Sequence, residues 1–207
     1  MAGISESNKV SLVLKQKGKP FFTMGILRPL SEIGGVLFPY TPTIQVSHAA
    51  NYGTYDITGS VYQQNYYINT ANPGLSVTAM FTCNTEEETL YTAAAFQFFK
   101  TCTKSEFGIS AGDKAGTPPP ILRFNAYGSV HHRNVPCILR SFTYTLPEDV
   151  DYVEVDVAGE KISLPTQTIV SLELTPQLPP KTVKDKFNIR TFASGSLLSG
   201  GNNGGFM

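Results

Sequence analysis

Charged residues are scarce in this chain. Only 15% of its 207 residues are charged, whereas a typical soluble domain has about 25%. Lysine and arginine together number 16, as do aspartate and glutamate, so the net charge is zero and no basic surface for nucleic acid is predicted. Because so little charge is available to cover an isolated domain, we expect part of the surface to be buried in an assembly.

Cysteine is equally sparse, and long apolar runs are missing. The three cysteines, Cys83, Cys102 and Cys137, are widely spaced, which indicates a reducing compartment rather than a disulfide framework. No run approaches the apolar length of a membrane span, and Met1 to Gln16 has no signal-peptide core, so we expect no membrane contact. The length suits one domain with a good core.

Motifs for catalysis and metal binding are also missing. Gly34-Gly35 is not followed by Lys-Ser/Thr, which excludes a phosphate loop, and there is no G-x-S-x-G or CxxC spacing. His131 and His132 lie side by side on a predicted strand, where neighbours point to opposite faces, so they do not favour a shared metal ion. We expect no enzyme activity, no cofactor and no metal.

An acidic cluster leaves several interpretations open. A hydrolase would use such residues as paired carboxylates, but nothing nearby supplies a base or an electrophile, so we favour a solvated turn and strand face. A structural alternative is that the carboxylates repel DNA from a tube wall or pair with a neighbour's Arg123, Arg133 or Arg140. The cluster consists of Glu148, Asp149, Asp151, Glu154 and Asp156.

What the chain does contain is a long alternation of apolar and small polar residues. Two segments, 44–52 and 75–83, alternate strictly and predict paired antiparallel strands with one packed and one wet face. On this pattern Ile44, Val46, Val77 and Phe81 point to the packed face. The predicted wet, lumen-facing set is uncharged: Gln45, Ser47, Asn51, Ser76, Thr78 and Thr82.

One helix interrupts the strands. Thr85 to Glu88 has the pattern of a capping box, and a helix of about Glu86 to Thr103 is predicted to follow. Its apolar stripe should pack Leu90, Ala94, Phe98 and Cys102 onto the sheet. Phe96 lies off this stripe, which makes it a candidate subunit contact.

The chain divides into an N-terminal segment (1–34), a β domain (35–176) and an extended C-terminal arm (177–207). Further strands are expected near residues 10–14, 61–68, 121–127, 135–146, 150–157, 161–164 and 166–174. The arm is rich in proline and glycine yet carries apolar residues, so we expect it to fold onto a neighbouring subunit. Its candidate interface residues are Phe187, Ile189, Phe192 and Phe206.

The order of several short motifs resembles a known family. They are Pro39-Tyr40-Thr41-Pro42, an Ala-Ala-Phe-x-Phe-Phe-Lys helix core (Ala94 to Lys100), Pro118-Pro119-Pro120, an Asn-x-Tyr-Gly turn (Asn125 to Gly128), Leu146-Pro147-x-x-Val150-Asp151-Tyr152-Val153 and a Gly-Gly-aromatic end. In this order they resemble the tail-tube initiator and baseplate-tube proteins of contractile-tailed bacteriophages. The resemblance covers Gly35 to about Leu174.

The resemblance implies a mainly β fold: a tail-tube-like β-sandwich or barrel with one flanking α-helix, whose long strands contribute to a shared inner barrel. It implies a structural virion protein that forms a hexameric ring, templates tail-tube polymerisation on the baseplate and lines the DNA channel. The implied partners are further copies and adjacent tube or baseplate rings, with DNA passing through without specific binding. Assembly would take place in the host cytoplasm, and the final location would be the virion.

A second function class remains open on the sequence. Tyr62, Tyr66 and Tyr67 could form a sugar-stacking platform on a carbohydrate-binding β-sandwich. The chain has no tryptophan, which argues against this interpretation.

Overall fold

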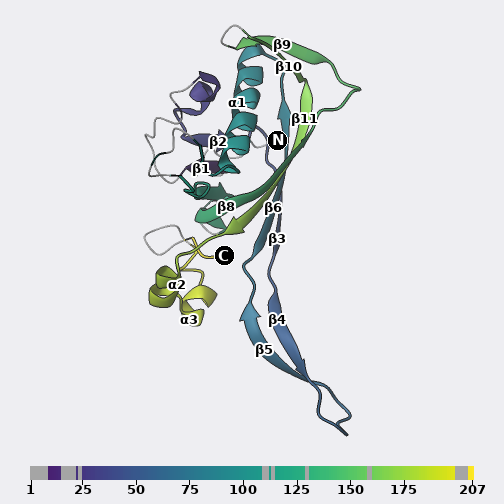
Figure 1. Cartoon of the computed structure of the whole chain (residues 1–207), viewed down its shortest axis with the longest axis vertical. Coiled ribbons are helices and arrows are strands. Elements are labelled where there is room, and N and C mark those ends of the chain that lie inside the picture. The colour runs from purple at the N-terminus through teal and green to yellow at the C-terminus, as the bar shows by residue number, and fades with distance from the viewer. Residues whose placement is uncertain are drawn as a thin grey trace.

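One antiparallel sheet organises the molecule (Figure 1). The computed structural model describes residues 9–14, 22, 25–108, 112, 115–128, 131–157, 160–198 and 205–207. The main sheet has seven strands in the order β2-β1-β7-β8-β11-β6-β3. These strands are β1 (Ser11–Leu14), β2 (Gly35–Leu37), β3 (Thr43–Ser47), β6 (Gly74–Thr82), β7 (Leu122–Ala126), β8 (His132–Thr145) and β11 (Gln167–Pro176).

The core lies between this sheet and the helix α1 (Glu86–Cys102). Strands β6 and β11 alternate strictly between buried and more accessible positions, as a sheet with one covered face requires. The buried side of these two strands holds Val77, Phe81, Val170 and Leu172, all fully buried. The predicted pairing of the two alternating segments is confirmed where β3 runs antiparallel to β6.

The described N-terminal residues belong to the same body. Strand β1 lies between β2 and β7 in the main sheet, and a 3-10 helix, η3 (Gly25–Leu30), packs against α1. Leu12 and Leu30 are fully buried in the common core. The boundary expected before Gly35 therefore does not separate the described N-terminal residues from the β domain.

Helix α1 begins at its predicted capping box. The amide of Glu88 donates to Thr85 Oγ1 (3.3 Å), and the Glu88 carboxylate accepts from the amide of Asn84 (3.0 Å). Among the predicted packing residues, Ala94, Phe98 and Cys102 are fully buried, whereas Leu90 is only half-buried.

The prediction for Phe96 is wrong. Its side chain is 5% exposed and its ring packs on Phe81, Phe142 and Tyr144, with centroid distances of 6.0, 6.1 and 5.0 Å. The helical stripe alone did not place it because the sheet and η3 cover more than one side of α1. Phe96 is thus a core residue and has little surface left for a neighbouring subunit.

The long strand predicted for residues 44–52 is interrupted. It ends at Ser47 and resumes after His48 and Ala49 as β4 (Ala50–Tyr55), which pairs with β5 (Gln64–Thr70) in a separate two-stranded ribbon. Figure 1 shows this ribbon extending far from the body. A second two-stranded sheet pairs β9 (Tyr152–Val157) with β10 (Glu160–Pro165), and β9 lies against α1.

The expected sandwich or barrel is replaced by an open sheet. Among the described residues no sheet closes into a barrel. The coarser prediction, a mainly β fold with few helices, is confirmed.

The C-terminal arm contains more structure than its composition indicates. It forms two short helices, α2 (Pro180–Lys186) and α3 (Ile189–Ala193). Phe206 is 4% exposed and lies on Phe187 with ring centroids 5.8 Å apart, so its predicted role at a subunit interface is corrected to packing within its own chain. Phe187 and Ile189 stay exposed and Phe192 is half-buried.

Candidate assembly interface

A broad face of mostly polar side chains, with Met80 and Ile169 among them, covers the outer side of four neighbouring strands. Residues that pair directly across antiparallel strands share a face, and the register β3-β6-β11-β8 aligns Gln45 with Ser76, Ser76 with Glu173, and Glu173 with Ser141. We call this surface the hydroxyl face. It consists of Thr43, Gln45, Ser47, Ser76, Thr78, Met80, Thr82, Ser141, Thr143, Thr145, Gln167, Ile169, Ser171 and Glu173.

Five of the six residues predicted to share a wet surface lie on the hydroxyl face. The sixth, Asn51, does not, because the break at His48 and Ala49 separates β4 from the main sheet. Asn51 instead donates through its side-chain amide to Asn69 Oδ1 (2.8 Å) across the β4–β5 ribbon. Ile44, Val77 and Phe81 lie on the opposite face of the sheet, as predicted. Val46 also points to that face but is 38% exposed, because it lies near the end of its strand.

The sequence prediction missed the half of this face that β8 and β11 supply. A signal was present in β11, where buried Thr168, Val170, Leu172 and Leu174 alternate with accessible residues. Strand β8 gave a weaker signal, because a register shift between Glu173 and Leu174 of β11 disturbs its alternation.

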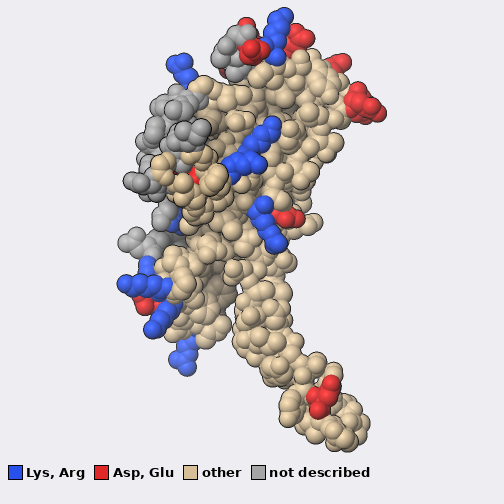
Figure 2. All heavy atoms as spheres, in the orientation of Figure 1, with Lys and Arg blue, Asp and Glu red and all other residues tan. Residues whose placement is uncertain are grey.

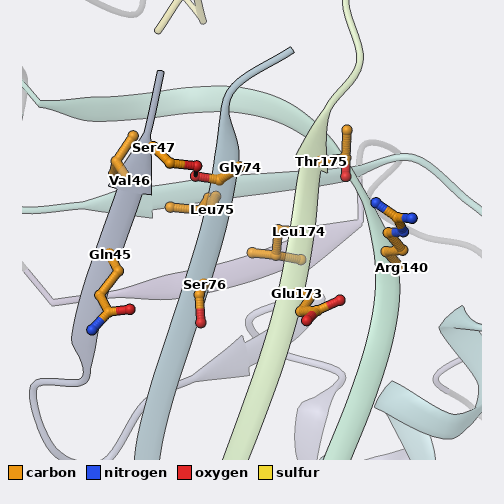
Figure 3. Close-up of a pocket in the computed structure, with 10 residues that line it drawn as sticks. All are labelled: Gln45, Val46, Ser47, Gly74, Leu75, Ser76, Arg140, Glu173, Leu174 and Thr175. Carbon is orange, nitrogen blue, oxygen red and sulfur yellow. Dashed lines mark hydrogen bonds between the residues drawn. The ribbon is translucent and has the colours of Figure 1, made fainter. Parts of the chain in front are cut away.

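A hollow of about 440 Å³ lies at these four strands. Figure 3 shows Gln45, Ser76 and Glu173 in a row across β3, β6 and β11, with Arg140 of β8 beside them. Of the residues on the hydroxyl face only Glu173 is charged. The face therefore offers neither a basic patch that would hold phosphates nor a cluster of carboxylates for acid–base chemistry.

This four-stranded section has two edges that remain unpaired within the described chain. Strand β3 is the last strand of the sheet. At the other side, β7 pairs only with residues 132–137 of β8, so Ile138 to Thr145 pair with β11 alone. Unpaired edges carry rows of free N–H and C=O groups, which are templates for pairing with another chain.

The β4–β5 ribbon exposes a second candidate surface. Every residue of β5 is exposed, and Asp56 is the only charged residue between Ala50 and Thr70. An isolated two-stranded hairpin is at best marginally stable in water, and exposed apolar patches of this kind mark interaction sites. Its exposed large side chains are Tyr52, Tyr55, Ile57, Val61, Tyr62, Tyr66, Tyr67 and Ile68.

The ribbon does not present its tyrosines as one platform. Tyr66 and Tyr67 are adjacent in β5 and so point to opposite faces. Tyr67 stacks edge-on against Tyr52 (5.8 Å between centroids), while the ring of Tyr66 lies over Gly53, where an added Cβ would meet it at 2.5 Å. A flat sugar-binding surface made of Tyr62, Tyr66 and Tyr67 is therefore not formed.

Burial shifts the pKa values of several of the described thiols and of one histidine. Burial raises the pKa of Cys137 to about 12 and also raises that of Cys102, so both thiols stay protonated and are poor nucleophiles. Burial lowers the pKa of His132, and the nearby His131 and His48 lower it further. Within the described residues, no group of three or more histidines, cysteines or carboxylates is placed to hold a metal ion.

The predicted acidic cluster lies on β9 and the turn before it. Glu148, Asp149, Asp151, Glu154 and Asp156 are all exposed, as the solvated interpretation expects. Arg123, one of the arginines considered as a partner, instead donates to the carbonyl of Asn134 (2.9 Å).

Comparison with models of known protein families and with curated protein sequences found no match. Along the described part of the chain, no helix has both the length and the apolar character to cross a bilayer.

Proposed function

We propose that this protein is a structural virion subunit that forms the ring on which a phage tail tube starts. The four-stranded section β3-β6-β11-β8 carries the proposal, since it combines a hydroxyl face with two unpaired edges. Edge β3 of one copy pairs with the free part of β8 of the next, and repetition around a ring closes the sheet. Closure removes the exposed edges and leaves a wet interior.

The chemistry of the hydroxyl face suits the lining of a DNA channel. DNA must pass through such a channel without being held, and tight binding to DNA comes mainly from lysine and arginine contacts to phosphates. The hydroxyl face has no lysine or arginine, and Arg140 lies only at its margin. The ring size, six copies, rests on the resemblance of the sequence motifs to tail-tube proteins.

Imaging the full-length protein tests the proposal. We expect rings by negative stain and a closed oligomer by native mass spectrometry. Thr43→Lys with Gln45→Lys places two charges on the edge strand, a device that blocks edge-to-edge pairing, and should yield monomers. The matched control, Ser76→Lys with Thr78→Lys, adds the same charge to the same face one strand inward and should keep the rings. A wild-type chain that stays monomeric at high concentration contradicts the proposal.

A further inference from the structure

Acidic and basic residues gather at opposite ends of the main sheet, the acidic ones near the start of strand β11 and the basic ones near its end. At its start, the amide of Thr166 donates to the carbonyl of Asp151 (2.7 Å) and the amide of Cys83 donates to the carbonyl of Thr166 (2.9 Å). These bonds bring the beginning of α1 and the acidic strand β9 to one end of the sheet. Along the described residues of the first turn of α1, the turn before β9, β9 and β10, this acidic end holds nine carboxylates and one lysine: Glu86, Glu87, Glu88, Glu148, Asp149, Asp151, Glu154, Asp156, Glu160 and Lys161.

The basic charge lies at the other end. There the amide of Gln177 donates to the carbonyl of Pro136 (2.8 Å), and the C-terminal arm begins. Helices α2 and α3 with their flanks carry Lys181, Lys184, Lys186 and Arg190 against a single carboxylate, Asp185. The two ends are separated by the ten residues of β11, or about 33 Å. Figure 2 shows red atoms gathered over β9 and β10 and blue atoms over α2 and α3.

The acidic end contains a cleft suited to a basic side chain. The cleft measures about 370 Å³ and is lined by Tyr40 and Tyr91 together with Glu87 and Glu88. The Tyr91 hydroxyl donates to the carbonyl of Leu37 (2.7 Å) and accepts from its amide (2.8 Å), so its ring is held in place. Fixed aromatic walls accommodate the alkyl stem of a lysine or arginine, and the carboxylates attract its charged end.

The basic arm has the complementary character. Val183, Phe187 and Ile189 are 39%, 44% and 68% exposed, so apolar side chains accompany the positive charges. An arm that combines both features matches a cleft that combines aromatic rings with carboxylates. In its own chain the arm lies at the opposite end of β11, which leaves a second copy as the partner that can bring the two surfaces together.

We propose that copies of this protein stack head to tail, with the basic C-terminal arm of one copy docking on the acidic end of the next. A contact between two different surfaces repeats without closing when copies are related by translation, which produces a linear stack. This inference deepens the proposed ring function by naming the contact between rings. It uses surfaces separate from the β3 and β8 edges, so ring formation and stacking can fail independently.

Charge reversal tests the docking. Lys181→Glu with Lys184→Glu reverses the arm, and Glu87→Lys with Glu148→Lys reverses the acidic end. We expect either pair to lower the fraction of stacked rings at least about tenfold in negative stain at about 50 mM salt while single rings persist. Combining all four substitutions should restore the stacks. Wild-type stacks should shorten at about 500 mM salt, where the charges are screened.

The control reverses two exposed charges elsewhere, Arg28→Glu with Lys104→Glu, and should leave stacking unchanged. Equal loss of stacks in this control, or no recovery in the four-fold variant, overturns the inference. If native mass spectrometry finds salt-sensitive linear oligomers but no rings, head-to-tail docking stands and the proposed ring function fails. If rings form but no variant changes their stacking, the ring function stands and the docking fails.

Discussion

The phenylalanines of α1 show how single residues hold the helix on the sheet. Phe98 stacks on Phe22 (5.9 Å between centroids), while Phe99 contacts Phe38 and Phe142 at 6.5 and 5.2 Å. Each ring therefore joins α1 to a different part of the chain. Because these contacts combine apolar burial with favourable ring geometry, we expect single substitutions here to affect the whole fold.

Phe98→Ala should lower the free energy of unfolding by about 3–5 kcal/mol, since the ring is fully buried and its loss leaves a cavity. Chemical denaturation of the purified chain measures the change. Gln97→Ala, at an exposed neighbouring position, is the control and should change stability by less than about 0.5 kcal/mol. An unchanged unfolding midpoint for Phe98→Ala would reject a packed helix.

His132 should make stability depend on pH. Its pKa is lowered in the folded chain by burial and by His131 and His48, so below the ordinary value of about 6.5 the unfolded chain binds the proton more readily. Stability is then fully present above pH 6.5 and is lost as the pH falls toward the lower folded pKa. Denaturation of wild type between about pH 7.5 and 5 should show this loss, and His132→Gln should reduce it. An equal loss in the variant would assign the effect to other groups.

At the scale of elements, the β4–β5 ribbon differs from the rest of the fold. At the base of the ribbon, next to the main sheet, the amide of Ala71 donates to the carbonyl of Ala49 (2.9 Å). None of its residues belongs to the buried core. A segment that costs backbone entropy to order but buries little apolar surface gains its stability elsewhere, which favours burial of the ribbon in an assembly.

Replacing residues 50–70 with an Asn-Gly turn should leave the body folded and prevent normal assembly. Asn-Gly suits the tight turn needed to join Ala49 to Ala71, and the core loses no member. A melting curve close to wild type with a smaller native mass would fit this expectation. Loss of cooperative unfolding would show instead that the ribbon stabilises the monomer.

At the scale of the whole molecule, the C-terminal arm is only partly packed on the rest of its own chain. It is anchored to its own body through Gln177, and Met207 packs against the common core, yet much of α2 and α3 remains exposed. The arm is therefore neither a free tail nor an integral part of the core. This intermediate position suits a segment that finishes folding when it docks.

Deleting residues 181–207 should keep the body folded while weakening the contacts between rings. Removing Phe206 and Met207 uncovers apolar surface, so we expect a modest loss of stability, about 1–3 kcal/mol. Denaturation measures this loss, and native mass spectrometry measures assembly. A truncated chain that assembles and stacks like wild type would contradict the role given to the arm.

The sequence determined the local features whose causes are local. The capping box at Thr85, the alternation in β6 and the scarcity of charge each follow from neighbouring residues or from composition. The mainly β character followed from the alternating segments. Only the tertiary structure decided features that depend on distant partners. Phe96 is buried because β8 brings Phe142 and Tyr144 to it, and Asn51 leaves the hydroxyl face because the strand breaks before it. The separation of charge between the ends of β11 also required the fold, since hydrogen bonds between distant segments bring Glu86 and Asp151 to one end.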